Sequence, residues 1–218
     1  MFTCVAETRS SGARAARRVR AGAGLQIVKR LILLIAMALV GGPTSAAEKT
    51  EHPITYVYVL LGGLAGADGY VDSNGLLLLA GRIANIPNTW VEIYPWRDWV
   101  TAANRVWARS SKDARVAVVG YSGGGSRATW LANSVLHKSI DLIVTYDPSP
   151  KWQMQNLPPN VKKAITFENQ IPFIFGLGGG ELTGPNVQHF LIREEHLLVQ
   201  FDERLHQITL QAIEDLAK

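Results

Sequence analysis

Residues 115–124 read RVAVVGYSGG, and this stretch decides which fold the chain is expected to adopt. The run from Arg115 to Val119 is short, apolar and rich in β-branched residues, which predicts a buried strand. Residues 128–137 are apolar at helical spacing. Between these two segments, residues 120–124 fit G-x-S-x-G, the pattern of a sharp strand-to-helix turn that exposes a serine. The sequence therefore predicts that Ser122 stands as a nucleophile at the end of a strand.

Apolar runs alternate with helical patterns from Ile54 onward. The expected strands are residues 54–61, 89–94, 115–119, 141–146, 163–167 and 187–193, and the expected helices are 74–85, 98–109 (with Asp98 as N-cap), 128–137 and 202–217. Strands joined by helical crossovers indicate an α/β fold, with a parallel sheet of about six strands covered by helices on both faces. The carboxyl ends of parallel strands share one edge, so functional loops are expected to gather there.

The first 47 residues differ from the remainder of the chain. Basic residues precede the ten-residue apolar block Leu31–Val40, and Gly41-Gly42-Pro43 and the small residues 44–47 follow it. This order predicts a secretory signal peptide over residues 1–47, with residues 48–218 as a single secreted or periplasmic domain. An uncleaved membrane anchor is the alternative, although ten apolar residues fall short of the roughly 20 that span a bilayer.

The positive net charge belongs to this leader. The chain has a formal net charge of +4, but residues 1–47 hold seven of its 22 Lys and Arg and one of its 18 Asp and Glu. Residues 48–218 therefore hold 15 basic and 17 acidic residues, a net charge of −2. A nucleic-acid surface is not indicated. Because the only cysteine is Cys4, the expected mature domain has no disulfide, thiol nucleophile or cysteine-based metal site, and we expect no metal or other cofactor.

An activated serine needs a base and an acid, which follow it in the order Ser, Asp or Glu, His in one well-known arrangement. Asp147 ends the strand that comes next after the serine helix, so it lies at the active edge and is the first choice for the acid. Glu168, at the end of the following strand, is the alternative. His196 follows the last strand, in the loop before the terminal helix, and is the first choice for the base. His206 and His189 are the alternates.

A hydrolytic serine also needs N–H donors for the oxyanion. The N–H of Gly123, directly after the serine, is one candidate. The glycine-rich loop at residues 61–66 follows the first strand and offers the second, with Leu64 as first choice and Gly63 as alternate. This loop lacks the spacing of either common nucleotide-binding glycine pattern.

Several local patterns resemble those of the α/β-hydrolase superfamily over nearly all of residues 48–218. They are similar in particular to small, secreted, lidless bacterial members: residues 59–64 with 73–76, the serine turn, residues 141–148, residues 178–184, and His196 with Asp202 and His206 behind it. The resemblance implies a minimal α/β-hydrolase fold and a triad of Ser122, Asp147 and His196. It names no substrate.

The expected function is hydrolysis of ester or thioester bonds through a Ser-His-Asp triad and an acyl-enzyme, with a small-molecule ester or acyl substrate. No stable membrane association is expected once the signal peptide is removed. Trp96, Trp99 and Trp152 either line an acyl pocket or pack in the core and rim. Thioesterase, amidase and acyltransferase activities share this triad. The alternative from another class is a non-catalytic secreted binding protein with the same fold.

Overall fold

The computed structural model describes residues 53–63, 73–109, 113–149, 156–170 and 178–218, all within the compact unit Thr50–Lys218. The predicted signal peptide, Leu64 and Trp152 lie outside these residues. No helix within the described ranges is long and apolar enough to cross a bilayer.

The described residues form one six-stranded sheet in which all neighbouring strands are parallel, as the alternation of strands and helices predicts. Its strands are β1 (Thr55–Leu61), β2 (Thr89–Pro95), β3 (Arg115–Tyr121), β4 (Leu142–Tyr146), β5 (Ala164–Asn169) and β6 (Val187–Ile192), in the order β2-β1-β3-β4-β5-β6. The interior strands β4 and β5 are buried along their whole length, as expected of a sheet covered on both faces.

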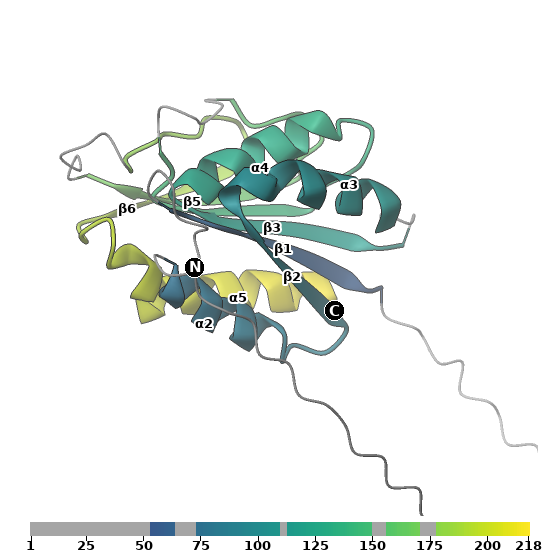
Figure 1. Cartoon of the computed structure of the whole chain (residues 1–218), viewed down its shortest axis with the longest axis horizontal. Coiled ribbons are helices and arrows are strands. Elements are labelled where there is room, and N and C mark those ends of the chain that lie inside the picture. The colour runs from purple at the N-terminus through teal and green to yellow at the C-terminus, as the bar shows by residue number, and fades with distance from the viewer. Residues whose placement is uncertain (1–52, 64–72, 110–112, 150–155, 171–177) are drawn as a thin grey trace, which may run out of the picture. The chain divides into compact units, whose positions relative to one another are not determined.

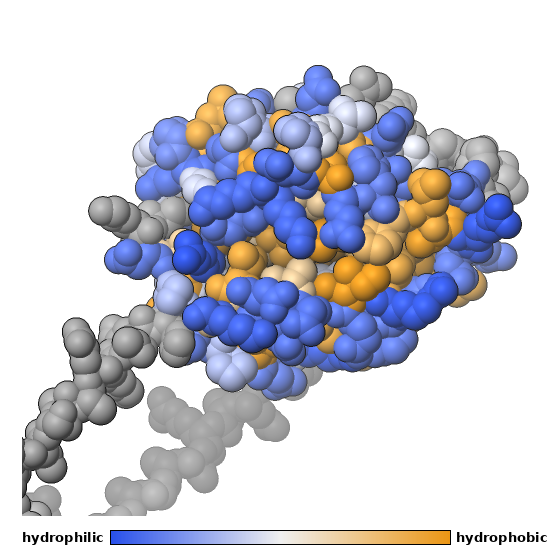
Figure 2. Space-filling model, turned by 180° about the vertical axis from the view of Figure 1, so that it is seen from behind, coloured by the Kyte–Doolittle hydropathy of each residue, from blue (hydrophilic) through white to orange (hydrophobic). Residues whose placement is uncertain are grey.

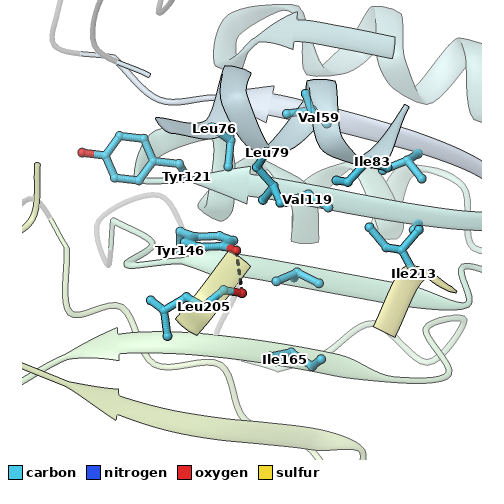
Figure 3. Packing of buried hydrophobic residues seen from close by; sticks show 14 of the residues in the cluster. Val59, Leu76, Leu79, Ile83, Val119, Tyr121, Tyr146, Ile165, Leu205 and Ile213 are labelled. Atoms are coloured by element: carbon cyan, nitrogen blue, oxygen red, sulfur yellow. Dashed lines mark hydrogen bonds between the residues drawn. The ribbon is translucent and has the colours of Figure 1, made fainter. Parts of the chain in front are cut away.

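Helices cover both faces of the sheet (Figure 1). The helices α2 (Asn74–Ile83) and α5 (Glu203–Ala217) lie on one face, and α3 (Trp99–Arg109) and α4 (Gly123–Ser134) lie on the other. Each face has its own hydrophobic cluster. In the cluster of Figure 3, Leu76 and Leu79 of α2 pack with Val119 of β3, and the Tyr146 hydroxyl donates to the carbonyl of Leu205 in α5 at 3.0 Å.

One predicted helix start and one predicted helix cap are wrong. The helix α4 begins at Gly123, five residues before the predicted start, because its first turn is built from glycines that carry no apolar pattern. Asp98 does not cap α3. It ends the short 3₁₀ helix η1 (Trp96–Asp98), and no hydrogen bond found in the described residues joins its side chain to α3. Asp202 does cap α5, since its side chain accepts from the N–H of Arg204 at 2.8 Å.

The strand β6 forms one edge of the sheet, and most of its residues are partly or fully exposed. Leu191 on this strand is 64% exposed, and Leu197, Leu198 and Phe201 beyond it are about half exposed. The surface near the end of β6 therefore offers apolar side chains to solvent. On the face of the molecule shown in Figure 2, hydrophobic residues gather in a band between hydrophilic regions.

Candidate active site

The turn between β3 and α4 is strained in the way that G-x-S-x-G predicts. Ser122 has φ 52° and ψ −119°, a conformation that L-residues rarely adopt. A Cβ atom at Gly120 would lie 2.5 Å from the carbonyl oxygen of Gly124, and one at Gly124 would lie 2.1 Å from the carbonyl oxygen of Leu60. Only glycine fits at both positions, so the sharp turn is fixed by backbone packing.

The structure brings Ser122, His196 and Asp147 together from three separate loops at the carboxyl edge of the sheet. The Ser122 Oγ lies 2.9 Å from His196 Nε2, and His196 Nδ1 lies 2.6 Å from Asp147 Oδ2. All three residues are buried, with exposures of 5%, 2% and 0%. In a neutral imidazole the Nδ1–H would donate to the carboxylate, which leaves Nε2 to accept the serine hydroxyl proton.

Asp147 is held by the glycine-rich segment that follows β5. Its φ is 41°, and its Oδ1 accepts from the N–H of Gly179 at 2.6 Å and from that of Asn169 at 3.3 Å. Gly178 has φ 83°, and a Cβ atom there would lie 2.2 Å from Asp147 Oδ2. The sequence does not predict that Gly178 and Gly179 hold the acid. The only signal for this role is the glycine-rich composition of the segment.

His196 is held by a residue of the serine turn itself. The Tyr121 hydroxyl donates to the carbonyl of His196 at 3.0 Å, and the two rings are stacked with centroids 5.2 Å apart and planes 29° apart. A Cβ atom at Gly62 would lie 2.7 Å from the Tyr121 ring, so this glycine makes room for the ring. The side-chain amide of Asn169 donates to the carbonyl of Glu194, two residues before the histidine. Asn169 therefore bonds both to the acid Asp147 and to the loop that carries the base.

The alternates lie elsewhere. Glu168 Oε1 is 3.1 Å from Nδ1 of His189 and accepts from the N–H of Leu182 at 3.3 Å, so the alternative acid pairs with one alternative base. His206 Nε2 donates to the carbonyl of Gln200 at 2.7 Å, and burial lowers the pKa of this histidine. None of these three side chains has a described hydrogen bond to Ser122.

Gly123 is the first residue of α4, so its N–H is unpaired within the helix and lies next to Ser122, at the positive end of the helix dipole. A Cβ atom at Gly123 would touch the ring of Trp96 at 3.5 Å, which places this ring beside the serine turn. Gly63 ends the described part of the first glycine loop and is partly exposed. Trp99 is partly buried against the core and stands 6.4 Å from Trp130, so it packs between α3 and α4.

Within the part of the chain that the structure describes, no group of three or more His, Cys, Asp and Glu side chains is placed to hold a metal ion.

Comparison with known proteins gives only distant structural similarity. No protein family and no curated protein matches the sequence. Est1E from Butyrivibrio proteoclasticus is 9% identical, with 77% of this chain and 88% of that chain covered and a TM-score of 0.48. YbtT, a type II thioesterase from the yersiniabactin NRPS/PKS biosynthetic pathway, is 8% identical, with 78% and 96% covered and a TM-score of 0.47. XC6422 from Xanthomonas campestris, an a/b serine hydrolase without lid, is 12% identical, with 77% and 84% covered and a TM-score of 0.47.

Similarity at this level does not identify a reaction, and the fold is identified from the chain itself. Its sheet is parallel, helices cover both faces, and a strained serine turn joins a central strand to the helix behind it. That serine lies at the carboxyl edge of the sheet, where this class of fold presents its functional groups. The chain has an α/β-hydrolase fold.

Proposed function

We propose that this protein is a serine hydrolase that cleaves ester or thioester bonds through an acyl-enzyme. The observation that carries the proposal is the continuous hydrogen-bonded line from Ser122 Oγ through His196 to Asp147, with distances of 2.9 and 2.6 Å. A serine at the end of a strand needs such a base to become a nucleophile, and the base needs an acid to fix its tautomer.

The proposed reaction has two halves. His196 Nε2 takes the proton of Ser122 Oγ while the oxygen attacks the substrate carbonyl carbon, and the resulting imidazolium gives this proton to the leaving alkoxide or thiolate. Water then attacks the acyl-enzyme with His196 again as base, and the acid product and free serine are released. Asp147 stabilises the imidazolium in both halves, and the N–H of Gly123 is proposed to donate to the oxyanion, with Leu64 or Gly63 as second donor.

The contacts of Asp147 support a role in catalysis beyond packing. Two backbone N–H groups donate to Oδ1, and among the described residues His196 is the only hydrogen-bond partner of Oδ2. The carboxylate is thereby fixed in orientation before a substrate binds, as electrostatic preorganisation requires. From the layout of residues 1–47 we also propose that the protein is exported.

Covalent labelling tests the proposal. We expect a fluorophosphonate probe to label the wild-type protein on the peptide that contains Ser122, and the protein to hydrolyse p-nitrophenyl acetate, butyrate and octanoate. Ser122→Ala and His196→Ala should each lower kcat by at least about 10³-fold, because triad members act as a unit. Ser134→Ala is the matched control, since this serine of α4 donates only to the carbonyl of Leu131. If folded wild-type protein is neither labelled nor active, the hydrolase proposal fails and the binding-protein alternative replaces it.

A further inference from the structure

Two arginines flank the tryptophan beside the serine turn. The guanidinium carbon of Arg127, in α4, is 5.7 Å from the centre of the Trp96 ring and 5.6 Å from that of Trp130. The guanidinium carbon of Arg97, in η1, is 5.1 Å from the Trp96 ring. The same Trp96 ring lies against Gly123, so both guanidinium groups contact a ring that borders the proposed oxyanion donor.

Neither arginine has a carboxylate partner in the described part of the chain, where other basic side chains do form ion pairs. Arg127 is only partly exposed, and its Nε atom is buried without a hydrogen-bond acceptor among the described residues. Burial lowers its pKa, which means that its charge is held where water solvates it poorly. The nearby carboxylate of Asp98 is exposed and belongs to none of the described ion pairs. Buried donors of this kind normally have a partner, so an absent acceptor needs an explanation.

The direction of the Arg127 side chain matters. Side chains of an α-helix lean toward its N-terminus, so a residue covers the turn that precedes it. Arg127 follows Gly123 by one turn, and its contact with Trp96 agrees with this direction. The guanidinium therefore leans toward the carboxyl edge of the sheet, where the positive end of the α4 dipole adds to the same field.

We propose that Arg127, assisted by Arg97, binds a negatively charged group of the substrate, and that the preferred substrate is an ester carrying a carboxylate. The proposal rests on the hydrolase function proposed above. A guanidinium binds a carboxylate through two parallel N–H···O bonds, and the Arg127 guanidinium also contacts the indole rings of Trp96 and Trp130. Such a charge-assisted contact would give the Arg127 Nε an acceptor, which it does not have among the described residues.

Paired substrates test the charge preference on each side of the ester bond. For the acyl side, mono-4-nitrophenyl adipate is compared with 4-nitrophenyl hexanoate. For the alcohol side, 4-acetoxybenzoate is compared with phenyl acetate. The measured quantity is the ratio of kcat/KM for the anionic ester to kcat/KM for the neutral one, in wild type, Arg127→Met, Arg127→Lys and Arg97→Met. Arg115→Met is the control, because this exposed arginine lies at the amino-terminal end of β3, at the end of the strand opposite to Ser122.

For at least one of the two substrate pairs, we expect Arg127→Met to lower the ratio of kcat/KM for the anionic ester to that for the neutral ester about tenfold or more. This is the size expected of a hydrogen bond to a charged group. Arg97→Met should lower it less, because Arg97 is exposed, and Arg127→Lys should recover part of it. The wild-type ratio should also fall when ionic strength rises from about 0.01 M to about 1 M, where the screening length shortens from about 30 to 3 Å.

A ratio that is the same in wild type and Arg127→Met in both arms overturns the inference, and the arginines then serve only to pack α3, α4 and η1 together. A fall of equal size in Arg115→Met also overturns it, since the effect would then reflect net charge. Fluorophosphonate labelling of Ser122 is measured in every sample. Labelling without a charge preference refutes this inference alone, whereas absence of labelling refutes the hydrolase proposal.

Discussion

Replacing Gly178 with alanine should disable the candidate site through its acid. In the native structure a Cβ atom at this position would lie 2.2 Å from Asp147 Oδ2 and 2.6 Å from its Cγ. Contacts of real Cβ atoms with non-bonded atoms stay above about 3.0 Å, so the carboxylate and the glycine segment must separate by about 0.8 Å. The Oδ2 atom that must move is the one that faces His196 Nδ1.

The size of the effect follows from this displacement. A misplacement of about 1 Å can cost about 10²-fold in rate, and loss of the correct histidine tautomer costs up to about 10⁴-fold. We therefore expect Gly178→Ala to lower kcat/KM for a p-nitrophenyl ester by at least about 10²-fold. The left-handed backbone at φ 83° adds a strain of roughly 1 kcal/mol, and a weakened hydrogen bond to the carboxylate adds about 1.5–3 kcal/mol of destabilisation.

Gly179 provides the matched comparison. Its φ of 74° carries similar backbone strain, but the nearest described atom to a Cβ atom there is the carbonyl oxygen of Asn169 at 3.6 Å. Its N–H bond to Asp147 is retained. Gly179→Ala should therefore lose at least tenfold less activity than Gly178→Ala. Both variants are assayed for ester hydrolysis and urea unfolding at a temperature where both are folded. Equal losses in the two variants, or full activity in Gly178→Ala, would refute the reasoning.

Three other substitutions test the stability of α2, the positioning of His196 and the protonation of His206. Gly81→Ala should raise the free energy of unfolding by about 0.5–1 kcal/mol, because Gly81 is exposed within α2 and a Cβ atom there meets nothing within 4 Å. A melting temperature below that of wild type would contradict this prediction. Tyr121→Phe removes the hydroxyl that donates to the His196 carbonyl but keeps the stacked ring, so kcat should fall about tenfold with little change in KM. A loss of kcat below about twofold would show that the stacked ring alone is enough to position His196. Burial lowers the pKa of His206 in the folded state, so the unfolded chain binds the proton first and the free energy of unfolding should fall as the pH drops through about 6.5 toward the lower folded pKa. In urea unfolding between about pH 5 and 8, His206→Gln should show a smaller change of this free energy with pH than wild type. An unchanged pH dependence would exclude this histidine as its cause.

The sequence predicts the parts of the site that depend on chain order. Ser122 and Asp147 each follow a strand with a clear apolar pattern, and parallel strands bring such ends to one edge. His196 follows β6, an edge strand whose apolar pattern is weaker because three of its six residues are exposed. It precedes α5, however, whose amphipathic pattern is clear. These three positions could therefore be found from local patterns together with the topology of the fold.

Contacts that depend on register and loop conformation could not be predicted in this way. Glu168 and His189 pair across β5 and β6 because Thr166 is in register with His189, and one sequence does not specify that register. The roles of Gly178 and Gly179 depend on left-handed backbone conformations in an irregular segment. The stacking of Tyr121 on His196 joins residues 75 positions apart, and no local pattern reports such a contact.

The position of β6 at the edge of the sheet has a consequence for how the protein responds to heat. The loop that carries His196 leaves from this strand, which has a paired neighbour on one side only and exposes three of its six residues. Edge elements of this kind open at a lower free energy than the centre of a sheet. Ser122 and Asp147, in contrast, follow the central strands β3 and β4. Partial melting would thus separate the base from the other two groups while the core remained intact, and ester turnover should be lost at a lower temperature than the circular dichroism of the sheet.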